Sequence, residues 1–388
     1  MPESLSIAFY TDTFLPAVDG VVTSILNFRQ ELMHRGNDVY ILASGDSKTK
    51  AMVKNQKNIF VVRGMKFKNY PQYNLALFPF SSALKLRKAK VDLVHAHTPF
   101  TMGIYALLQS RINSIPITGS FHTLFTDSAV INEYIADKRL RKIAFKYSWP
   151  YIKFFYNRCD GVIAPSESIR ALLASKGISN LHTVPNSVDL KRFNTKVDGS
   201  RVREQLTGNK RDKVVMYVGR LSKEKHLETL IKAASTLKDK NIKFVICGTG
   251  PAGPHYHEMV RRMHLNEKVK FAGFISDELL PKYYAACDLF CIPSTFETQG
   301  IVSLEAMATG KPVVGADYLA LSELISNGHN GEKFRPDSAN DCARKIEKVL
   351  YNEDSYKGMV ETAKKYSIEK TTDDLLDAYK AVMDDASF

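Results

Sequence analysis

The sequence predicts an α/β protein made of two doubly wound domains in tandem, and three observations lead to this fold class. Short apolar runs, rich in β-branched residues, alternate with segments of helical spacing along the chain, which is the pattern of βαβ units in a parallel sheet. This series ends at a polar stretch, 196–212, and then starts again. The length of 388 residues fits two domains of ordinary size.

The first series begins with a strand at Ser4–Tyr10 and a helix at Val21–Arg35, which Gly36 ends. Further strand-like runs follow, each bounded by polar or turn residues: Val39–Ala43, Ile59–Val62, Val91–His95, Ile115–Ser120, Gly161–Ala164 and His182–Val184. The stretch 196–212 contains eight charged residues and two Gly, so we expect a linker there.

The second series alternates in the same way. Its expected strands are Lys213–Val218, Lys243–Cys247, Val269–Ala272, Leu289–Ile292 and Pro312–Gly315, and its expected helices are Glu224–Lys238, Asp277–Ala286, Ile301–Thr309, Ala339–Tyr351, Ser355–Ser367 and Glu369–Met383. Ligands of such sheets bind at the carboxyl ends of the strands, and the cleft between two domains is the default site.

Composition restricts the class of protein. The chain is 44% hydrophobic and 24% charged, which is ordinary for a soluble globular protein. No apolar run approaches the length of a membrane-spanning helix, and the N-terminus does not have the pattern of a signal peptide. Five cysteines without C-x-x-C spacing favour a reduced, cytoplasmic protein over a disulfide or zinc framework.

Positive charge is concentrated in the first half of the sequence. The net charge is +13; residues 1–195 carry 25 basic and 13 acidic side chains, and the remainder carries 29 and 28. This asymmetry indicates an anionic partner, either nucleic acid or an acidic membrane surface, and the alternative is a basic surface that only aids solubility. We find no RNA- or DNA-binding signature.

One basic segment, 138–158, combines seven basic residues and seven aromatic residues with no acidic residue. Pro150 is expected to divide it into two helices. Basic and aromatic side chains together are typical of a membrane-surface helix, for which the candidates are Lys138, Arg139, Arg141, Lys142, Lys146, Trp149 and Lys153. The alternative is a core helix that packs Leu140, Ile143, Ala144 and Tyr147 inward, and both interpretations can hold for different faces. The basic loop Lys48–Lys68 is a further candidate for this face.

Three motifs follow expected strands. Glu297 and Glu305 flank the start of one helix, where carboxylates suit sugar hydroxyls and free N–H groups from Gly300 onward suit an anion; read alone, both are more often surface charges. Arg220 and Lys225, after Val218, suit a diphosphate. Gly20 allows a close phosphate approach at the first helix, although ordinary turn chemistry explains it equally well.

Other motifs carry less information. The Gly-rich turn 247–251 is at least as easily structural. His122 lies at the carboxyl end of a strand. His95 and His97 lack the neighbours of a metal site, and no D-x-D triplet is present to hold a metal–diphosphate. We therefore expect no metal and no cofactor.

These residues together resemble family 4 of the glycosyltransferases, which has the GT-B fold and retains the anomeric configuration. The resemblance spans essentially the whole chain through YTDTFLPAVDGVVTSI, VHAHTPF, GSFHT, GVIAPSESI, VPNSVDL, VGRLSKEKHLETLI, CGTGP and STFETQGIVSLEAMATGKPVV. The variant ETQG, with the first of these segments, is similar to membrane-associated enzymes that glucosylate diacylglycerol.

The resemblance implies an acceptor- and membrane-facing Rossmann-like domain at 1–195, a nucleotide-sugar-binding Rossmann-like domain at 196–368, and a helix at 369–388 that returns to the first domain. There Asp373, Asp374, Asp377, Asp384 and Asp385 would meet its basic side chains. The resemblance implies a metal-independent, retaining hexosyltransferase. The favoured donor is UDP-glucose, and the expected acceptor is a membrane lipid hydroxyl such as that of diacylglycerol. The expected location is the cytoplasm, at the inner face of the cell membrane. The alternative is a GDP-mannose-dependent mannosyltransferase that acts on a phospholipid inositol or a glycan.

By matching position, the resemblance also implies residue roles. Glu305 would bind the ribose, Glu297 the donor sugar, Arg220 and Lys225 the diphosphate, the Gly20 amide the distal phosphate, and His122 the sugar and acceptor. The donor pocket would further include Phe274 and Ile275 near the base and the main chain of Thr298, Gln299, Gly300, Ile301 and Val302. The catalytic candidates are His122, Glu297, Arg220 and Lys225.

Two residues depart from the family pattern: Ser187 replaces a frequent Gly, which would cost energy if that position needs a positive φ, and Gln299 replaces a frequent Phe. Two other functions remain to be distinguished. A relative that hydrolyses or epimerises nucleotide sugars would give different products, and a nucleic-acid-binding protein would show steep salt dependence without turnover.

Overall fold

The structure is a computed structural model that describes residues 4–17, 19–66, 73–76, 89–126, 131–132, 135, 137–207, 212–237, 241–352 and 355–386. The chain forms two compact units: the first comprises Met1–Ser187 and Ile368–Phe388, and the second comprises Val188–Ser367. The first unit therefore includes the last helix of the chain, and its main segment ends eight residues before the boundary expected at 195.

In the described part of the first unit, eight strands form one sheet in the order β4-β3-β2-β1-β5-β6-β7-β8. All neighbours are parallel except β3 and β4, which are antiparallel. The strands are β1 Ser6–Thr11, β2 Asp38–Gly45, β3 Ile59–Lys66, β4 Asn74–Ala76, β5 Leu93–Ala96, β6 Ile117–Ser120, β7 Gly161–Ala164 and β8 Leu181–Thr183. Because β1 is flanked by β2 and β5, the strand order reverses there, as in a doubly wound sheet.

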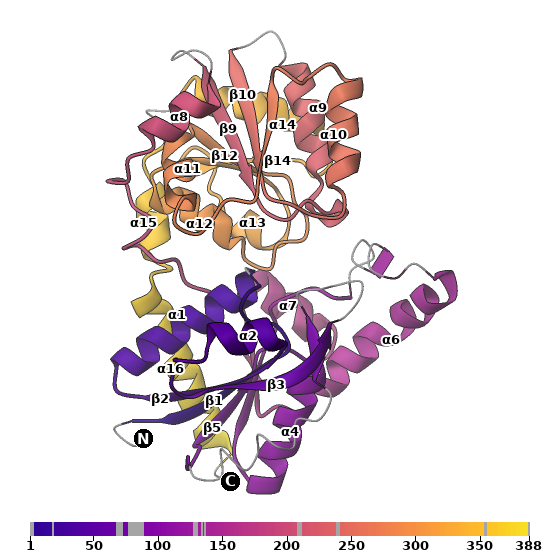
Figure 1. The fold of residues 1–388 in the computed structure, drawn as a ribbon, viewed down its shortest axis with the longest axis vertical. Coiled ribbons are helices and arrows are strands. Elements are labelled where there is room, and N and C mark those ends of the chain that lie inside the picture. The colour runs from indigo at the N-terminus through magenta and orange to yellow at the C-terminus, as the bar shows by residue number, and fades with distance from the viewer. Residues whose placement is uncertain are drawn as a thin grey trace. The chain divides into compact units, whose positions relative to one another are not determined.

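The helices of this unit are α1 Gly20–His34, α2 Ser47–Met52, α4 Thr101–Asn113, α6 Lys138–Tyr156, α7 Glu167–Ser175 and α16 Ile368–Asp385. Helices α1 and α16 lie side by side (Figure 1) and share one buried cluster with β1 and β2. From α16 this cluster takes Leu375, Ala378, Tyr379 and Val382. Arg35 pairs with Asp373 and donates 2.8 Å to the carbonyl of Glu369. The expected return of the last helix to the first domain is therefore confirmed.

The second unit contains a six-stranded parallel sheet in its described residues, in the order β11-β10-β9-β12-β13-β14. The strands are β9 Lys213–Val218, β10 Ile242–Cys247, β11 Val269–Gly273, β12 Leu289–Ile292, β13 Val313–Ala316 and β14 Gly331–Phe334. The helices are α8 Ser200–Leu206, the 3₁₀ turn η1 Lys223–Lys225, α9 Leu227–Thr236, α10 Gly253–Arg262, α11 Leu280–Ala286, α12 Ile301–Ala308, α13 Leu319–Leu324, α14 Ala339–Leu350 and α15 Met359–Lys364.

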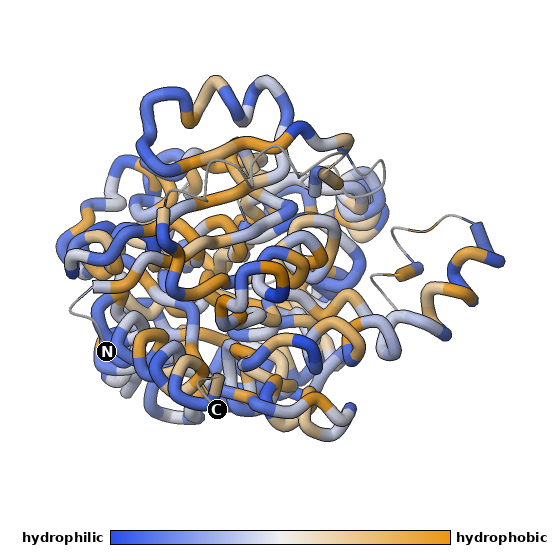
Figure 2. The backbone as a smooth tube through the Cα atoms, turned by 90° about the horizontal axis from the view of Figure 1, so that it is seen from below, coloured by the Kyte–Doolittle hydropathy of each residue, from blue (hydrophilic) through white to orange (hydrophobic). Residues whose placement is uncertain are grey.

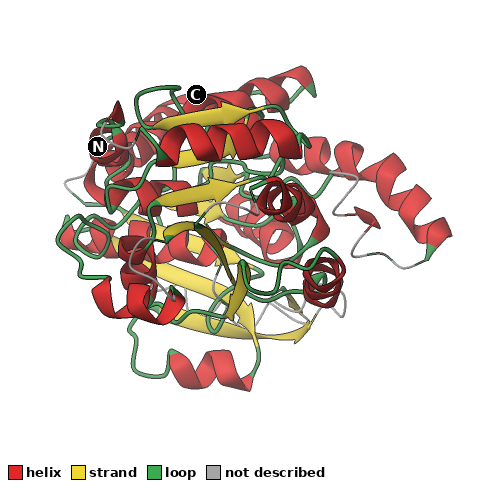
Figure 3. Cartoon of the chain, turned by 90° about the horizontal axis from the view of Figure 1, so that it is seen from above, coloured by secondary structure: helices red, strands yellow, loops and turns green. Residues whose placement is uncertain are grey.

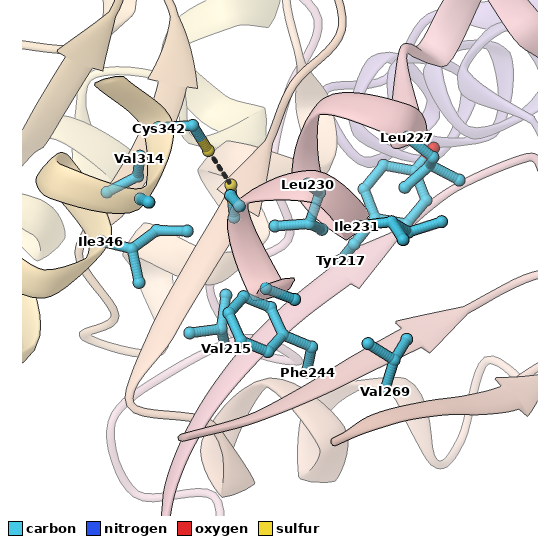
Figure 4. Close-up of a cluster of buried hydrophobic side chains, with 14 of the residues drawn as sticks. Val215, Tyr217, Leu227, Leu230, Ile231, Phe244, Val269, Val314, Cys342 and Ile346 are labelled. Atoms are coloured by element: carbon cyan, nitrogen blue, oxygen red, sulfur yellow. Dashed lines mark hydrogen bonds between the residues drawn. The ribbon is translucent and has the colours of Figure 1, made fainter. Parts of the chain in front are cut away.

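Helices cover both faces of the strands (Figure 3), and the core lies between them. One cluster of the second unit packs Val215, Leu230, Phe244 and Ile346 together (Figure 4). The same view shows Cys342, whose sulfur lies 3.9 Å from that of Cys291; both thiols are buried and reduced. The sequence predicted every strand except β4 and β14, and the two-domain α/β fold class is confirmed.

Two local expectations are wrong. The stretch 196–212 is not only a linker, because it contains α8, which buries Val202 and Leu206. Pro150 does not divide the basic segment either, since α6 is continuous through it. After Pro150 the side chains of Ile152, Phe155 and Tyr156 are buried, and they anchor the C-terminal half of the helix.

Candidate active site

The second unit places two of the predicted loops next to each other. Strands β9 and β12 are neighbours at the point where the strand order reverses, which is where ligands bind in doubly wound sheets. The loop 219–226 follows β9, and the loop 293–300 follows β12. The motifs with Arg220 and Lys225 and with Glu297 therefore meet at one edge of the sheet, although they are more than 70 residues apart in sequence.

Lys225 and Glu297 form an ion pair across these loops. The Lys225 Nζ atom donates to Glu297 Oε1 at 2.7 Å, and the side chains are 20% and 15% exposed. Lys225 also lies over the ring of Phe296, 5.8 Å from its centroid. Partial burial strengthens such a pair because less water screens it. An ammonium group has three donors, so Lys225 can keep this contact and still bind an anion.

His226 connects the same two loops and was not predicted. Its backbone is left-handed (φ 51°, ψ 35°), and its Nε2 and Nδ1 atoms contact Thr295 Oγ1 at 3.1 Å and Asp337 Oδ1 at 2.7 Å. Left-handed conformations are uncommon for residues other than Gly. The two ring contacts therefore hold a strained turn immediately after Lys225.

Glu305 lies on α12, eight residues after Glu297 in the sequence, and is 8% exposed. The hydroxyl of Tyr284, on α11, donates to Glu305 Oε2 at 2.8 Å. Burial raises the pKa of Glu305 to about 7, against the lowering effects of the Tyr284 hydrogen bond and of Arg192. Near neutral pH this carboxyl group therefore changes its charge readily.

Glycines bring the neighbouring turns into close contact. A Cβ atom on Gly248 would lie 1.9 Å from the carbonyl oxygen of Gly219, and one on Gly250 would lie 2.4 Å from that of Leu221. The Gly248 N–H donates to the Gly273 carbonyl at 2.7 Å. The Gly-rich turn follows β10, between the ends of β9 and β11, and its glycines have a structural role there because they allow close contact with the backbone of the segment that contains Arg220.

The other predicted donor residues surround this edge. Phe274, 61% exposed, and Ile275 follow Gly273 after β11. Gly300 is left-handed (φ 85°) and begins α12 without a side-chain cap, so the first N–H groups of the helix can face a ligand. The carbonyl of Arg220 accepts from the Tyr217 hydroxyl at 3.1 Å. Between Glu297 and α12 lie Thr298, half-buried, and Gln299, which is buried.

The first unit has its own polar cluster at the carboxyl ends of β5 and β6. His122 Nε2 lies 3.1 Å from His97 Nδ1, and the His97 ring stacks on that of His95 at 3.9 Å. His95 contacts the hydroxyls of Ser120 at 2.7 Å and of Tyr379, on α16, at 2.6 Å. Burial lowers the pKa of His122 to about 4 and those of His95 and His97 well below the usual value. His122 is therefore a neutral imidazole near pH 7.

Gly20 is exposed and begins α1. Asp19 caps this helix by accepting from the Val22 N–H at 2.9 Å, which leaves the Gly20 amide at the helix N-terminus. Asp12, buried after β1, accepts from the Met102 N–H and Thr98 and so caps the start of α4. At Ser187 the backbone φ is not positive, so the family's frequent Gly is not required there.

In the part of the chain that the structure describes, no group of three or more His, Cys, Asp or Glu side chains is arranged to hold a metal ion. His95, His97 and His122 of the first unit contact each other and hydroxyl groups instead.

Helix α6 projects from the first unit (Figures 1 and 3), and hydrophilic and hydrophobic residues alternate along it (Figure 2). Leu140, Ile143 and Tyr147, expected to pack inward under the core alternative, are 53–56% exposed. With Tyr151 (37%) and Phe154 (47%) they form an exposed stripe at helical spacing, which we call the apolar stripe. The core alternative is therefore wrong for this face.

Basic side chains flank the apolar stripe. Lys138, Arg139, Lys142, Lys146 and Lys153 are exposed, whereas Arg141 and Trp149 are half-buried. Trp149 lies under Lys176, 5.2 Å from its ammonium group. The segment 48–68, expected as a basic loop, contains most of α2 and the whole of β3, and its residues 67 and 68 lie outside the described residues. Among the helices that the structure describes, none is long and apolar enough to span a membrane.

Two family models match the chain. The model of glycosyl transferases group 1 matches residues 199–366, and the model of glycosyltransferase family 4 matches residues 18–192. Together they cover both units.

Several curated proteins are similar over most of their length. The alpha-monoglucosyldiacylglycerol synthase of Streptococcus pneumoniae is 30% identical over 83% of this chain and 74% of the relative, and that of Acholeplasma laidlawii is 27% identical over 85% of each. A GDP-mannose-dependent alpha-mannosyltransferase of Corynebacterium glutamicum is 29% identical over 84% of this chain and 76% of the relative.

Solved structures share the fold. Sucrose-phosphate synthase from Thermosynechococcus elongatus aligns with a TM-score of 0.80 and 21% identity over 98% of this chain and 99% of that one. Anabaena HepE in complex with UDP-glucose aligns with a TM-score of 0.75 and 22% identity over 97% and 100%. At these identities the likeness establishes the GT-B fold.

Proposed function

The chain belongs to family 4 of the glycosyltransferases, and from this premise we propose that it is a retaining, metal-independent hexosyltransferase that moves glucose from UDP-glucose to a membrane lipid hydroxyl such as that of diacylglycerol. The observation that carries the proposal is the Lys225–Glu297 pair at the sheet edge, with Glu305 on α12, the helix that follows the loop of Glu297. The similarity to two monoglucosyldiacylglycerol synthases supports the choice of donor and acceptor.

The proposed donor contacts follow the charges of the site. Glu305 accepts from the ribose hydroxyls and Glu297 from hydroxyls of the sugar, because a carboxylate can accept from a vicinal pair. Arg220 and Lys225 neutralise the diphosphate, and the amides of residues 298–302 complete the donor pocket. Phe274 and Ile275 contact the base, and the Gly20 amide, at the start of α1, contacts the distal phosphate.

The proposed reaction is a front-face displacement at the anomeric carbon, in which the acceptor enters on the side from which the diphosphate leaves, so that the configuration is retained. The acceptor oxygen bonds to that carbon, the bond from the carbon to the diphosphate oxygen breaks, and the acceptor proton passes to the leaving diphosphate. Negative charge grows on the diphosphate during this step, and fixed cations at Arg220 and Lys225 stabilise it. Burial lowers the pKa of His122 to about 4, so its imidazole is a weak base, and we propose that it orients the sugar and acceptor by hydrogen bonding rather than by taking the acceptor proton. Arg220 and Lys225 supply the charge that a metal ion would otherwise supply.

The lipid acceptor is supported by α6. An exposed apolar stripe with flanking lysines and arginines suits the interface of an anionic membrane, where apolar side chains enter the headgroup region and each cation adds about 1 kcal/mol. We propose that the enzyme works from the cytoplasm, bound peripherally to the inner face of the cell membrane, and that it has no nucleic-acid partner.

A donor screen tests the proposal. Release of nucleoside diphosphate is measured from UDP-glucose, GDP-mannose and other donors, with EDTA present or absent, and with anionic vesicles that contain or lack diacylglycerol. We expect UDP release from UDP-glucose only when diacylglycerol is present, unaffected by EDTA. Loss of activity in EDTA would overturn metal independence, and hydrolysis without an acceptor would indicate a different reaction class.

The alternative function is a GDP-mannose-dependent mannosyltransferase that acts on a phospholipid inositol or a glycan. The relative from Corynebacterium glutamicum supports it at nearly the same identity. Release of GDP from GDP-mannose in the same screen would favour this alternative and keep the proposed site.

A further inference from the structure

Among the described residues, Tyr284 is the one side chain that hydrogen-bonds to the carboxyl group of Glu305. Tyr284 lies within the core, 1% exposed or less, with its ring against Phe193 and Phe290 at centroid distances of 5.8 and 5.6 Å. A phenylalanine would make the same ring contacts. Burying a hydroxyl costs free energy unless it is hydrogen-bonded, so the Glu305 contact is what this hydroxyl contributes.

The hydrogen bond from Tyr284 uses only one of the two oxygen atoms of the Glu305 carboxyl group. Oε2 accepts from Tyr284, and no other described residue donates to the group, so Oε1 remains available to a ligand. We propose that Tyr284 is a positioning residue for nucleotide binding: its hydroxyl fixes the Glu305 carboxylate and favours its ionised form, so that the carboxylate can accept hydrogen bonds from the ribose. This inference rests on the ribose role proposed above for Glu305.

Other groups near Glu305 also affect the pKa of its carboxyl group. Tyr284 on α11 and Arg192 favour the ionised form, whereas burial and Asp277 oppose it; Arg192 and Asp277 are themselves paired at 3.4 Å. Helix α15 and strands β12 and β13 also pack on α12, and their titratable groups Glu361, Lys364 and Cys291 are not among the causes of the shift in the pKa of Glu305.

Removal of the Tyr284 hydroxyl is expected to raise the pKa of Glu305. A hydrogen bond to a carboxylate favours ionisation, so removing it raises the pH at which Glu305 becomes ionised. A shift of about one pH unit is expected for one such bond. If binding requires the carboxylate, affinity then falls about fivefold near pH 7 and returns almost to normal near pH 8.5. A merely structural defect would instead weaken binding equally at every pH.

The experiment measures equilibrium binding of UDP, and of GDP in parallel, by calorimetry between about pH 6 and about pH 8.5. The proteins are wild type, Tyr284→Phe, Glu305→Gln and the double variant. Because the terminal phosphate of the nucleotide also titrates in this range, the readout is the difference between each variant and wild type.

The matched control is Tyr356→Phe. Tyr356 is also buried, and its hydroxyl also donates to a buried carboxylate, Glu332 Oε1, at 3.1 Å. It belongs to no proposed site. We expect Tyr284→Phe to show the pH-dependent loss, Glu305→Gln to bind weakly at all pH values, the double variant to match Glu305→Gln, and Tyr356→Phe to bind as wild type does.

The outcomes separate the two proposals. If Tyr284→Phe binds with the wild-type pH profile while Glu305→Gln is weak, the role of Tyr284 is wrong and that of Glu305 stands. If Glu305→Gln binds as wild type does, the ribose role falls and this inference falls with it. If Tyr284→Phe does not fold, the comparison of wild type with Glu305→Gln still decides the matter: parallel profiles would overturn the inference, because Glu305 would then have no ionisation for Tyr284 to favour.

Discussion

The Lys225–Glu297 pair shows how one contact can serve both the free and the bound enzyme. Each group is mostly buried, and a charge in such a place needs a partner. In the absence of donor, Lys225 and Glu297 form an ion pair and neutralise each other's charge. When a nucleotide sugar binds, Lys225 can turn its remaining donors to the diphosphate while Glu297 accepts from the sugar.

We therefore predict that Lys225→Met lowers kcat/KM for the donor by about 10²–10³, the usual loss for one donor that stabilises developing charge. Methionine keeps most of the length of the unbranched side chain and removes its charge. Steady-state kinetics with the donor chosen by the screen measure the effect. Lys223→Met, on the same turn but exposed, is the control, and an equal loss in both variants would argue against a specific role for Lys225.

Single residues also mark the limit of what the sequence could predict. Arg220, Lys225 and Glu297 could be located near a sheet edge from the sequence, because they lie in loops at the carboxyl ends of predicted strands, with Glu305 on the helix that follows; their roles in donor binding stay a prediction. Tyr284 could not be found in this way, because its role depends on one hydroxyl meeting a carboxylate from another helix. His226 belongs to the same class, since its contacts to Thr295 and Asp337 join three separate loops.

Among the elements, α6 combines a correct prediction with an incorrect one. Its basic and aromatic composition predicted a membrane-surface helix; the exposure that this requires is confirmed for the apolar stripe, and the membrane contact itself stays a prediction. The break expected at Pro150 did not occur. The loss of one backbone hydrogen bond at a proline is offset by the packing of Ile152, Phe155 and Tyr156, and tertiary contacts of this kind are not visible in a local pattern.

We predict that the apolar stripe contributes to membrane binding independently of charge. Replacing Leu140 and Ile143 by Ser should weaken vesicle binding about 10- to 30-fold, because each half-exposed side chain loses roughly 1 kcal/mol of burial. The loss should persist at high salt, which screens only the basic residues. Vesicle sedimentation measures it.

The control for this pair is on α4, where Leu108 and Ile112 are 45% and 73% exposed. Their replacement by Ser removes a comparable amount of exposed apolar surface from the same unit. Equal weakening by both pairs would mean that α6 is not the binding element.

The last helix is a second element whose position can be tested. A Cβ atom on Gly161, in β7, would lie 2.3 Å from Val382 Cγ2 of α16. Gly161→Ala should therefore destabilise the protein by about 2 kcal/mol, the usual cost of overpacking a core, as measured by thermal unfolding. Combining it with Val382→Ala should cost less than the sum of the two single changes. Little or no destabilisation by Gly161→Ala would contradict this position of α16.

At the scale of the whole molecule, the fold redistributes the charge that the sequence seemed to concentrate. The unit that contains Met1–Ser187 and Ile368–Phe388 carries 25 basic and 18 acidic residues, and the other unit carries 29 and 23. Their net charges are therefore +7 and +6. The asymmetry between the halves of the sequence disappears because the acidic last helix belongs to the first unit. Sequence position could not reveal this, since it depends on where α16 packs.

The attraction to an anionic surface must then be local, and two variants of equal net charge can test this. The first replaces Lys138, Arg139, Arg141 and Lys142 of α6 by Gln, and the second replaces Lys232, Lys282, Lys364 and Lys365, which are exposed in the second unit. Each removes four positive charges. We expect the first to weaken binding to anionic vesicles by up to about three decades, at about 1 kcal/mol for each of the four residues near the surface, and the second to bind nearly as wild type does. Equal weakening would assign the attraction to net charge, and unchanged binding by both would remove α6 cations from the membrane proposal.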